Sequence, residues 1–134
     1  MYSTVLYIDD NPQLLELRKA TLESYGYRVK IASSGYAAMK MLEKASVAAV
    51  LLEYKLEGTD AEAIACRIKQ RFPNLPIILL SGYSEIPDRV LWLVDDYVMK
   101  SEVPEGLSRV IQRTTRSINT EEAHAEEVEE RKAA

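Results

Sequence analysis

Residues capable of metal or phosphate chemistry follow four separate apolar runs in this chain. The runs are typical of buried strands, and the residues at their ends are Asp9 and Asp10, Glu53, Ser81, and Lys100. In an open parallel sheet the carboxyl ends of the strands share one edge, and ligands bind there near the point where the strand order reverses. We therefore expect these five side chains, although distant in sequence, to converge on one site.

Such a cluster has a specific chemistry. Three carboxylates placed close together repel one another, and the repulsion raises the pKa of at least one of them unless a cation relieves it. Oxygen ligands with room for water suit Mg²⁺ or Mn²⁺ better than Zn²⁺. A metal beside a strand-end carboxylate can clamp phosphoryl oxygens, while an ammonium and a hydroxyl hold the others. The carboxylate can itself be the nucleophile and form an acyl phosphate.

Short apolar runs alternate with amphipathic stretches, and these elements must position the site. Strands are expected at residues 4–8, 28–32, 48–52, 77–80 and 97–99. Asn11 is a candidate cap for the first helix, and Gly26 is expected to end it, because glycine tolerates the left-handed backbone of a C-cap. Proline in a first turn favours a helix start. Helix starts are expected near Pro12, Tyr36, Asp60, Pro87 and Pro104.

The alternation predicts the fold class. Five strands alternating with five helices indicate βαβ units and a parallel sheet covered on both faces. Strands that are apolar throughout, rather than at every second residue, fit burial on both faces. Right-handed crossovers then give a doubly wound α/β domain. We predict this domain over residues 1–118, followed by a charged helical extension or tail over residues 119–134.

Composition excludes several classes of protein. The chain has 134 residues and a net charge of −4, whereas a nucleic-acid surface usually shows a basic patch. No apolar run approaches the roughly 20 residues that span a bilayer, and no signal peptide is apparent. The single cysteine, Cys66, excludes an internal disulfide. We expect a cytoplasmic protein that binds neither membrane nor nucleic acid.

Four motifs together resemble the receiver domain of response regulators, the CheY-like proteins of bacterial two-component phosphorelay systems. They are Asp9-Asp10, Leu-Leu-Glu-Tyr-Lys-Leu-Glu-Gly at 51–58, Leu-Leu-Ser-Gly at 79–82 and Asp-Asp-Tyr-Val-Met-Lys at 95–100. The resemblance covers about residues 2–116. It implies a flavodoxin-like sheet of five parallel strands in the order 2-1-3-4-5.

The resemblance also implies roles for the site residues. Asp9 and Asp10 would bind Mg²⁺, together with the backbone carbonyl of Lys55 and the carboxylate at position 53. Glu53 stands where the family carries its phosphorylated aspartate. Lys100 matches the lysine that pairs with the phosphoryl group.

A second implied set of residues carries the signal. Ser81 matches the switch hydroxyl, and Tyr97 matches the aromatic side chain that rotates inward when that hydroxyl moves. Implied partners are a sensor histidine kinase or phosphotransfer protein, and a downstream protein on the face of the fourth helix, fifth strand and fifth helix. Trp92 on that helix either covers the sheet edge or anchors a partner. The chain would be a signalling switch and not an enzyme.

Two positions depart from the family pattern. Ser101 follows Lys100 where a proline after a cis bond is usual, and a cis bond before serine would cost roughly 3 kcal/mol. Glu53 adds one methylene, about 1.5 Å of reach. Because a misplacement of ~1 Å can cost about 100-fold in rate, we expect phosphorylation of Glu53 to be severely impaired and Mg²⁺ binding to be weakened.

Three explanations for Glu53 remain open. It is an engineered imitation of the phosphorylated state, the residue of a natural atypical receiver, or a working acceptor. A rival interpretation of the whole site is a metal-dependent phosphohydrolase on a related α/β fold, with Asp9 as nucleophile. That class resembles Asp-x-Asp after the first strand, whereas here position 11 is asparagine.

The acidic tail allows two interpretations. The simplest interpretation is that the tail is a solvated helix, with His124 exposed to water. Alternatively, Ile111, Ile118, Ala125 and Val128 form a weak apolar stripe that makes the chain a homodimer.

Overall fold

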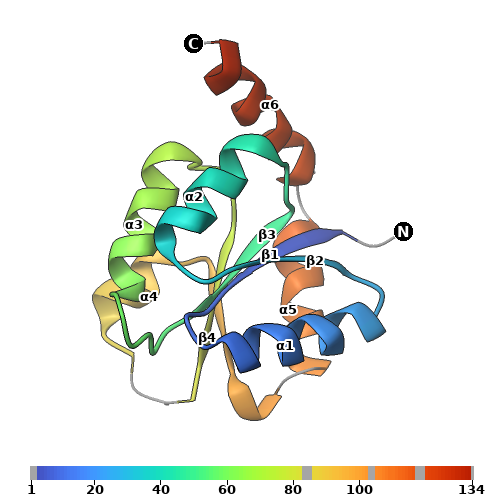
Figure 1. Ribbon diagram of the computed structural model, residues 1–134, viewed down its shortest axis with the longest axis vertical. Coiled ribbons are helices and arrows are strands. Elements are labelled where there is room, and N and C mark those ends of the chain that lie inside the picture. The colour runs from blue at the N-terminus through green and yellow to red at the C-terminus, as the bar shows by residue number, and fades with distance from the viewer. Residues whose placement is uncertain (1–2, 83–85, 103–104, 117–119, 134) are drawn as a thin grey trace.

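Five strands form one parallel sheet in the order β2-β1-β3-β4-β5, as predicted (Figure 1). The computed structural model describes residues 3–82, 86–102, 105–116 and 120–133. The strands are β1 Thr4–Ile8, β2 Arg28–Ala32, β3 Ala49–Glu53, β4 Ile77–Ser81 and β5 Asp96–Met99. The helices are α1 Pro12–Ser24, α2 Gly35–Lys44, α3 Ala61–Arg71, α4 Asp88–Leu93, the 3₁₀ helix η1 Lys100–Glu102, α5 Glu105–Arg116 and α6 Thr120–Ala133.

Local chemistry explains where the first three long helices begin. The side chain of Asn11 accepts hydrogen bonds from two backbone N–H groups of the first turn of α1. Ser34 caps α2 and Asp60 caps α3 in the same way. These bonds satisfy amides that the helix itself cannot pair. Beyond the end of α1, Gly26 has a φ of 95°, the left-handed conformation expected there.

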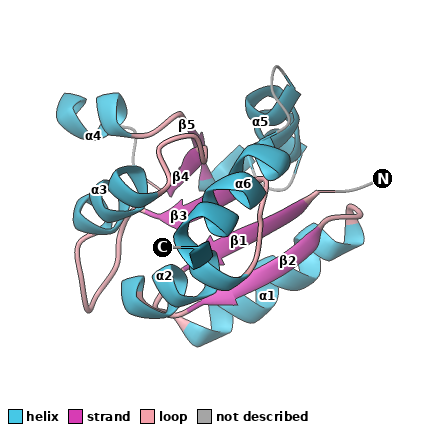
Figure 2. Cartoon of the chain, turned by 90° about the horizontal axis from the view of Figure 1, so that it is seen from above, coloured by secondary structure: helices cyan, strands magenta, loops and turns pink. Residues whose placement is uncertain are grey.

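The helices cover both faces of the sheet, as Figure 2 shows. α1 and α5 bury their apolar faces in one cluster, and α2, α3 and α4 bury theirs in a second cluster on the other face. The central strands β3 and β4 are buried along their whole length, which explains their uniformly apolar sequences. No helix in the described ranges is both long and apolar enough to cross a bilayer.

Element boundaries differ from expectation at a few places. Glu53 and Ser81 are the last residues of β3 and β4 rather than the residues after them. α4 begins at Asp88, and the carbonyl of Pro87 accepts the N–H of Val90 at 2.9 Å. After β5 the chain forms the short 3₁₀ helix η1. The expectations for Pro104 and Ile118 fall outside the described residues.

The tail is a helix that packs on the domain, and the expectation of a solvated His124 is wrong. His124 has no exposed surface, and Val128, four residues later, is 4% exposed in the core cluster of α2 and α3. Because residues four apart share one helix face, a single side of α6 carries both contacts. The proposed apolar stripe does not form in the described residues, since Ile111 and Val128 are buried in different clusters.

Candidate functional site

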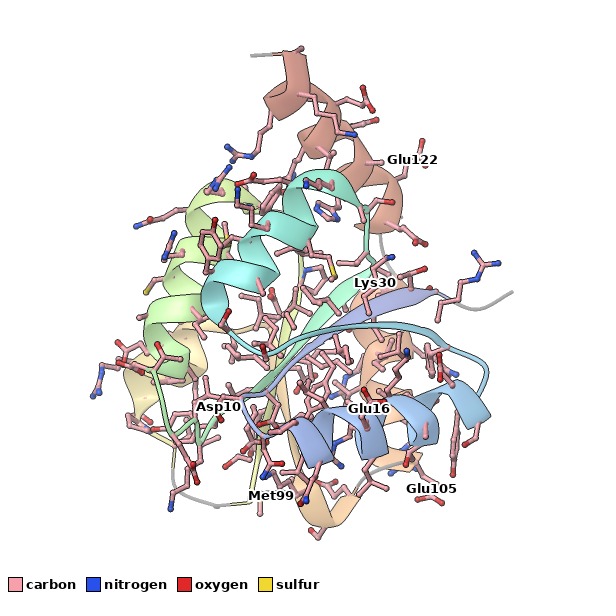
Figure 3. The ribbon with its side chains drawn as sticks, in the orientation of Figure 1. Asp10, Glu16, Lys30, Met99, Glu105 and Glu122 are labelled. Atoms are coloured by element: carbon pink, nitrogen blue, oxygen red, sulfur yellow. The ribbon has the colours of Figure 1, made fainter. Side chains whose placement is uncertain are left out.

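Four strand ends bring the expected residues to one end of the sheet. Ile8 lies opposite Leu52, Glu53 opposite Leu80, and Ser81 opposite Met99. Figure 3 shows Asp10 and Met99 near this end, with Glu122 of α6 at the far end. A pocket of about 390 Å³ opens there, and its lining includes Asp9, Asp10, Glu53, Lys55 and Lys100.

Glu53 is almost completely buried in this pocket, at 1% exposure, as is Asp9. Its Oε1 lies 3.0 Å from Nζ of Lys100 and accepts the N–H of Lys55 at 3.3 Å. Its Oε2 is buried, and no hydrogen-bond partner for it exists among the described residues. Burial raises the pKa of Glu53 above its usual range, against the opposing effects of Lys100 and the Lys55 N–H.

Each carboxylate oxygen of Asp9 accepts one hydrogen bond from a nearby residue. The hydroxyl of Tyr7 donates to Oδ2 at 2.5 Å, and the N–H of Asn11 donates to Oδ1 at 3.0 Å. Burial, and second to it the hydrogen bond to Asp9, raises the pKa of Tyr7. The phenol therefore stays protonated and remains a donor. Tyr7 was not among the predicted site residues. The available signal was its place two residues before Asp9, which puts both side chains on one face of the strand.

Asp10 holds the loop after β3 through hydrogen bonds to its backbone. Its Oδ2 accepts the backbone N–H groups of Glu57 and Gly58 at 2.7 and 2.8 Å. Asp10 therefore orders the segment that contains Lys55, as well as lining the pocket. This capping role was also not foreseen, because it joins residues 47 and 48 positions apart in the chain.

Ser81 and Tyr97 lie on neighbouring strands but in different surroundings. Ser81 is 1% exposed at the end of β4. Tyr97, on β5, is 45% exposed, whereas the next residue, Val98, is buried in the core. The Tyr97 ring is therefore on the outer side of β5 in this structure. Trp92 on α4 is 88% exposed, so it does not cover the sheet edge as one interpretation held.

The donor atoms of the pocket are chemically suited to a hard cation. Carboxylate oxygens of Asp9, Asp10 and Glu53 are the ligand type that Mg²⁺ prefers, and Oε2 of Glu53 has no partner in the described residues. Their arrangement is less favourable. In the part of the chain that the structure describes, no three His, Cys, Asp or Glu side chains are grouped so that they could hold a metal ion.

Solved structures resemble this chain throughout the sheet. TrrA of Thermotoga maritima, solved in complex with Mg²⁺-BeF, is 30% identical, with a TM-score of 0.76 over 85% of this chain and 99% of that one. The receiver domain of a sensor histidine kinase of Pseudomonas aeruginosa, with magnesium coordinated in its active site cleft, is 28% identical. Its TM-score is 0.77 over 87% of this chain and 100% of that one.

Curated sequences agree. A putative NtrX-like response regulator of Rickettsia felis is 33% identical over 88 residues, which are 64% of this chain and 18% of that protein. The DNA-binding response regulator MtrA of Mycolicibacterium smegmatis is 31% identical over 121 residues, 87% of this chain and 53% of that protein. The chain thus spans about half or less of the length of these relatives.

The comparisons do not support the phosphohydrolase interpretation. The family model described as "Response regulator receiver domain" matches residues 5–112, which include every strand residue except Thr4 and the whole lining of the pocket. The chain therefore belongs to the response regulator receiver domains of two-component systems.

Proposed function

We propose that this receiver domain is a protein-interaction switch in which Glu53 occupies the place of the phosphorylated aspartate and is itself a poor acceptor. The contact of 3.0 Å between Glu53 Oε1 and Lys100 Nζ is the observation that carries this proposal. The ammonium that would hold a phosphoryl oxygen is occupied by the carboxylate of the chain itself. The extra methylene of glutamate, about 1.5 Å, allows this reach from the end of β3.

Two further properties of Glu53 disfavour phosphoryl transfer. Burial raises its pKa, so a smaller fraction of the carboxyl group is in the deprotonated form that can attack phosphorus. The extra methylene also changes the position of the attacking oxygen from that of an aspartate, and attack geometry tolerates little displacement. The Glu53 carboxylate instead imitates the negative charge of a phosphoryl group next to Lys100. It does so with two oxygens, where a phosphoryl group offers three.

We propose that the carboxylates of Asp9, Asp10 and Glu53 bind Mg²⁺ weakly, with the Lys55 carbonyl as a further ligand. A bound Mg²⁺ would neutralise the carboxylates and orient the oxygens of an incoming phosphoryl group. Both oxygens of Asp9 and one oxygen of Asp10 already accept hydrogen bonds within the chain. A metal must compete with these donors, which supports weak binding.

The proposed partners are a sensor kinase or phosphotransfer protein at the pocket and a downstream protein on the face of α4, β5 and α5. The exposed rings of Trp92 and Tyr97 support a protein contact there, since aromatic side chains commonly anchor such contacts. The exposed Tyr97 ring corresponds to the arrangement that precedes inward rotation. The chain then acts by binding and has no turnover of its own.

Treatment with acetyl phosphate and Mg²⁺, followed by intact mass, tests the proposal. The protein should gain no phosphate, whereas Glu53→Asp should gain one, because aspartate restores the length of the acceptor. Glu53→Gln is the matched control and should gain none. One phosphate on the unchanged protein would refute the impaired acceptor. A Glu53→Asp variant that also stays unmodified would show that the whole site, and not only residue 53, has lost acceptor function.

A further inference from the structure

His124 fastens α6 to the rest of the domain through both of its ring nitrogens. Nδ1 lies 2.8 Å from the backbone N of Val47 and accepts its N–H. Because Nδ1 is an acceptor, the ring proton of the neutral imidazole is on Nε2, which lies 3.2 Å from the carbonyl oxygen of Leu42. One neutral side chain thus pairs two backbone groups, one in the last turn of α2 and one in the loop before β3.

Apolar and cationic contacts complete the docking of α6. The ring of Phe72 meets the imidazole edge to face at a centroid distance of 5.0 Å. Val128 packs into the same core cluster. Further along α6, the Arg131 guanidinium lies 4.9 Å from the centroid of the Phe72 ring, and Glu127 accepts the N–H of Asn74 at 3.3 Å.

We propose that α6 is a latch that stays docked on α2 and α3 while His124 is neutral and opens when the imidazole takes up a proton. A protonated ring carries N–H on both nitrogens. Nδ1 could then no longer accept the N–H of Val47, and two donors would face each other. The Val47 carbonyl oxygen is 3.3 Å from Nδ1 and could accept that proton only by leaving the Val47 N–H unpaired. A buried charge beside Phe72 and Val128 adds a desolvation cost.

Charged groups from every packed element bear on this proton. The backbone contacts with Leu42 and Val47 and the charge of Glu121 favour protonation. On α6, Arg131 lies over Phe72, and Glu127 faces the loop after α3. On the other side, Glu43 of α2 is paired with Arg71 of α3 at 2.5 Å, so the two charges largely offset each other. Burial outweighs the rest and lowers the His124 pKa below its ordinary value.

The direction of the pH dependence follows from this shift. In the undocked helix His124 has an ordinary pKa of about 6.5, and in the docked helix its pKa is lower. Docking is therefore strongest above pH ~6.5. It weakens as the pH falls below that value, by up to about tenfold per pH unit, until the pH passes the docked pKa.

The latch lies outside the features already described for the family. The family match ends at residue 112, and α6 begins at Thr120. In Figure 1 α6 lies above α2 and α3, and in Figure 3 its Glu122 lies at the opposite end of the molecule from Asp10. The proposal therefore does not rest on whether Glu53 accepts phosphate.

Two measurements on the full chain test the latch. His124 is the only histidine, so its imidazole resonance can be followed without ambiguity during an NMR titration. Hydrogen exchange of the α6 amides is measured over the same pH range and corrected for intrinsic rates, with the β1 and β3 amides as internal reference. The α6 protection should fall with pH by up to tenfold per unit, in step with the resonance, while the sheet stays protected.

Two variants separate titration from packing. His124→Gln offers one donor and one acceptor but does not titrate, so its α6 protection should be flat from pH 7 to pH 5. Val128→Ala should lower the α6 protection at every pH and keep the slope. An imidazole that titrates at or above pH 6.5, α6 protection independent of pH in the unchanged protein, or an unchanged slope in His124→Gln would each overturn the proposal.

Discussion

Tyr7→Phe is the most direct test of how the site is held together. The phenol is fully buried between the sheet and α1, with the Arg18 guanidinium carbon 5.8 Å from the ring centroid. The substitution removes one oxygen and leaves the ring in place. What is lost is the hydrogen bond of 2.5 Å to the Asp9 carboxylate.

The expected cost follows from the charge of the acceptor. A hydrogen bond to an ionised group contributes about 1.5–3 kcal/mol, roughly twice a neutral one. Asp9 keeps the N–H of Asn11, so its carboxylate does not lose all of its donors. We therefore expect a loss of about 2 kcal/mol in the free energy of unfolding. With a urea m-value of about 2 kcal/mol/M, the unfolding midpoint should fall by about 1 M.

Urea unfolding followed by circular dichroism measures this loss, with Tyr27→Phe as the matched control. The Tyr27 hydroxyl contacts the uncharged carbonyl and hydroxyl of Ser108 at 3.3 and 3.1 Å. Its removal should cost about 1 kcal/mol or less. Equal midpoint shifts in the two variants, or a Tyr7→Phe loss below about 0.5 kcal/mol, would show that the phenol does not hold Asp9.

The same variant bears on metal binding. Because Tyr7 and Mg²⁺ compete for the same carboxylate, Tyr7→Phe should tighten Mg²⁺ binding by up to about tenfold, the equivalent of 1.4 kcal/mol. Isothermal titration calorimetry measures the change, and an unchanged or weaker affinity would count against the competition.

Two simpler substitutions test the fold and the outer face. Gly26→Ala should cost about 1–2 kcal/mol in urea unfolding, because alanine is strained at a φ of 95°, and a neutral result would contradict the left-handed turn. Trp92→Ala should change stability by less than about 0.5 kcal/mol, because the ring is 88% exposed, and a larger loss would mean that the ring packs on the domain.

The sheet and the convergence of the site residues were predictable, because both follow from local patterns. Uninterrupted apolar strands separated by amphipathic helices leave few topologies, and parallel strands place their carboxyl ends together. Asp9, Asp10, Glu53 and Lys100 accordingly line one pocket. Their roles in metal binding and phosphate chemistry, and a cytoplasmic location, stay predictions.

Contacts between segments distant in sequence were not predictable from composition. His124 lies in a stretch dominated by glutamate, and that setting indicated a solvated helix. Its burial depends on α6 reaching Leu42 and Val47, residues 82 and 77 positions away. Asp10 likewise serves the distant loop after β3 through Glu57 and Gly58. Such pairings arise from the assembled fold and leave little trace in local periodicity.

The strand order also determines where the domain can yield to a change at residue 53. β3 is hydrogen-bonded on both sides, to β1 and to β4, and the next residue, Tyr54, donates to the Leu80 carbonyl at 2.8 Å. The backbone around Glu53 is thus held by pairing on both sides of β3, and any shift of it disturbs two neighbouring strands. β5 is an edge strand paired only with β4, and it leads into Lys100. Movement of β5, which bears Tyr97, disturbs strand pairing with one neighbour, whereas movement of β3 disturbs pairing with two.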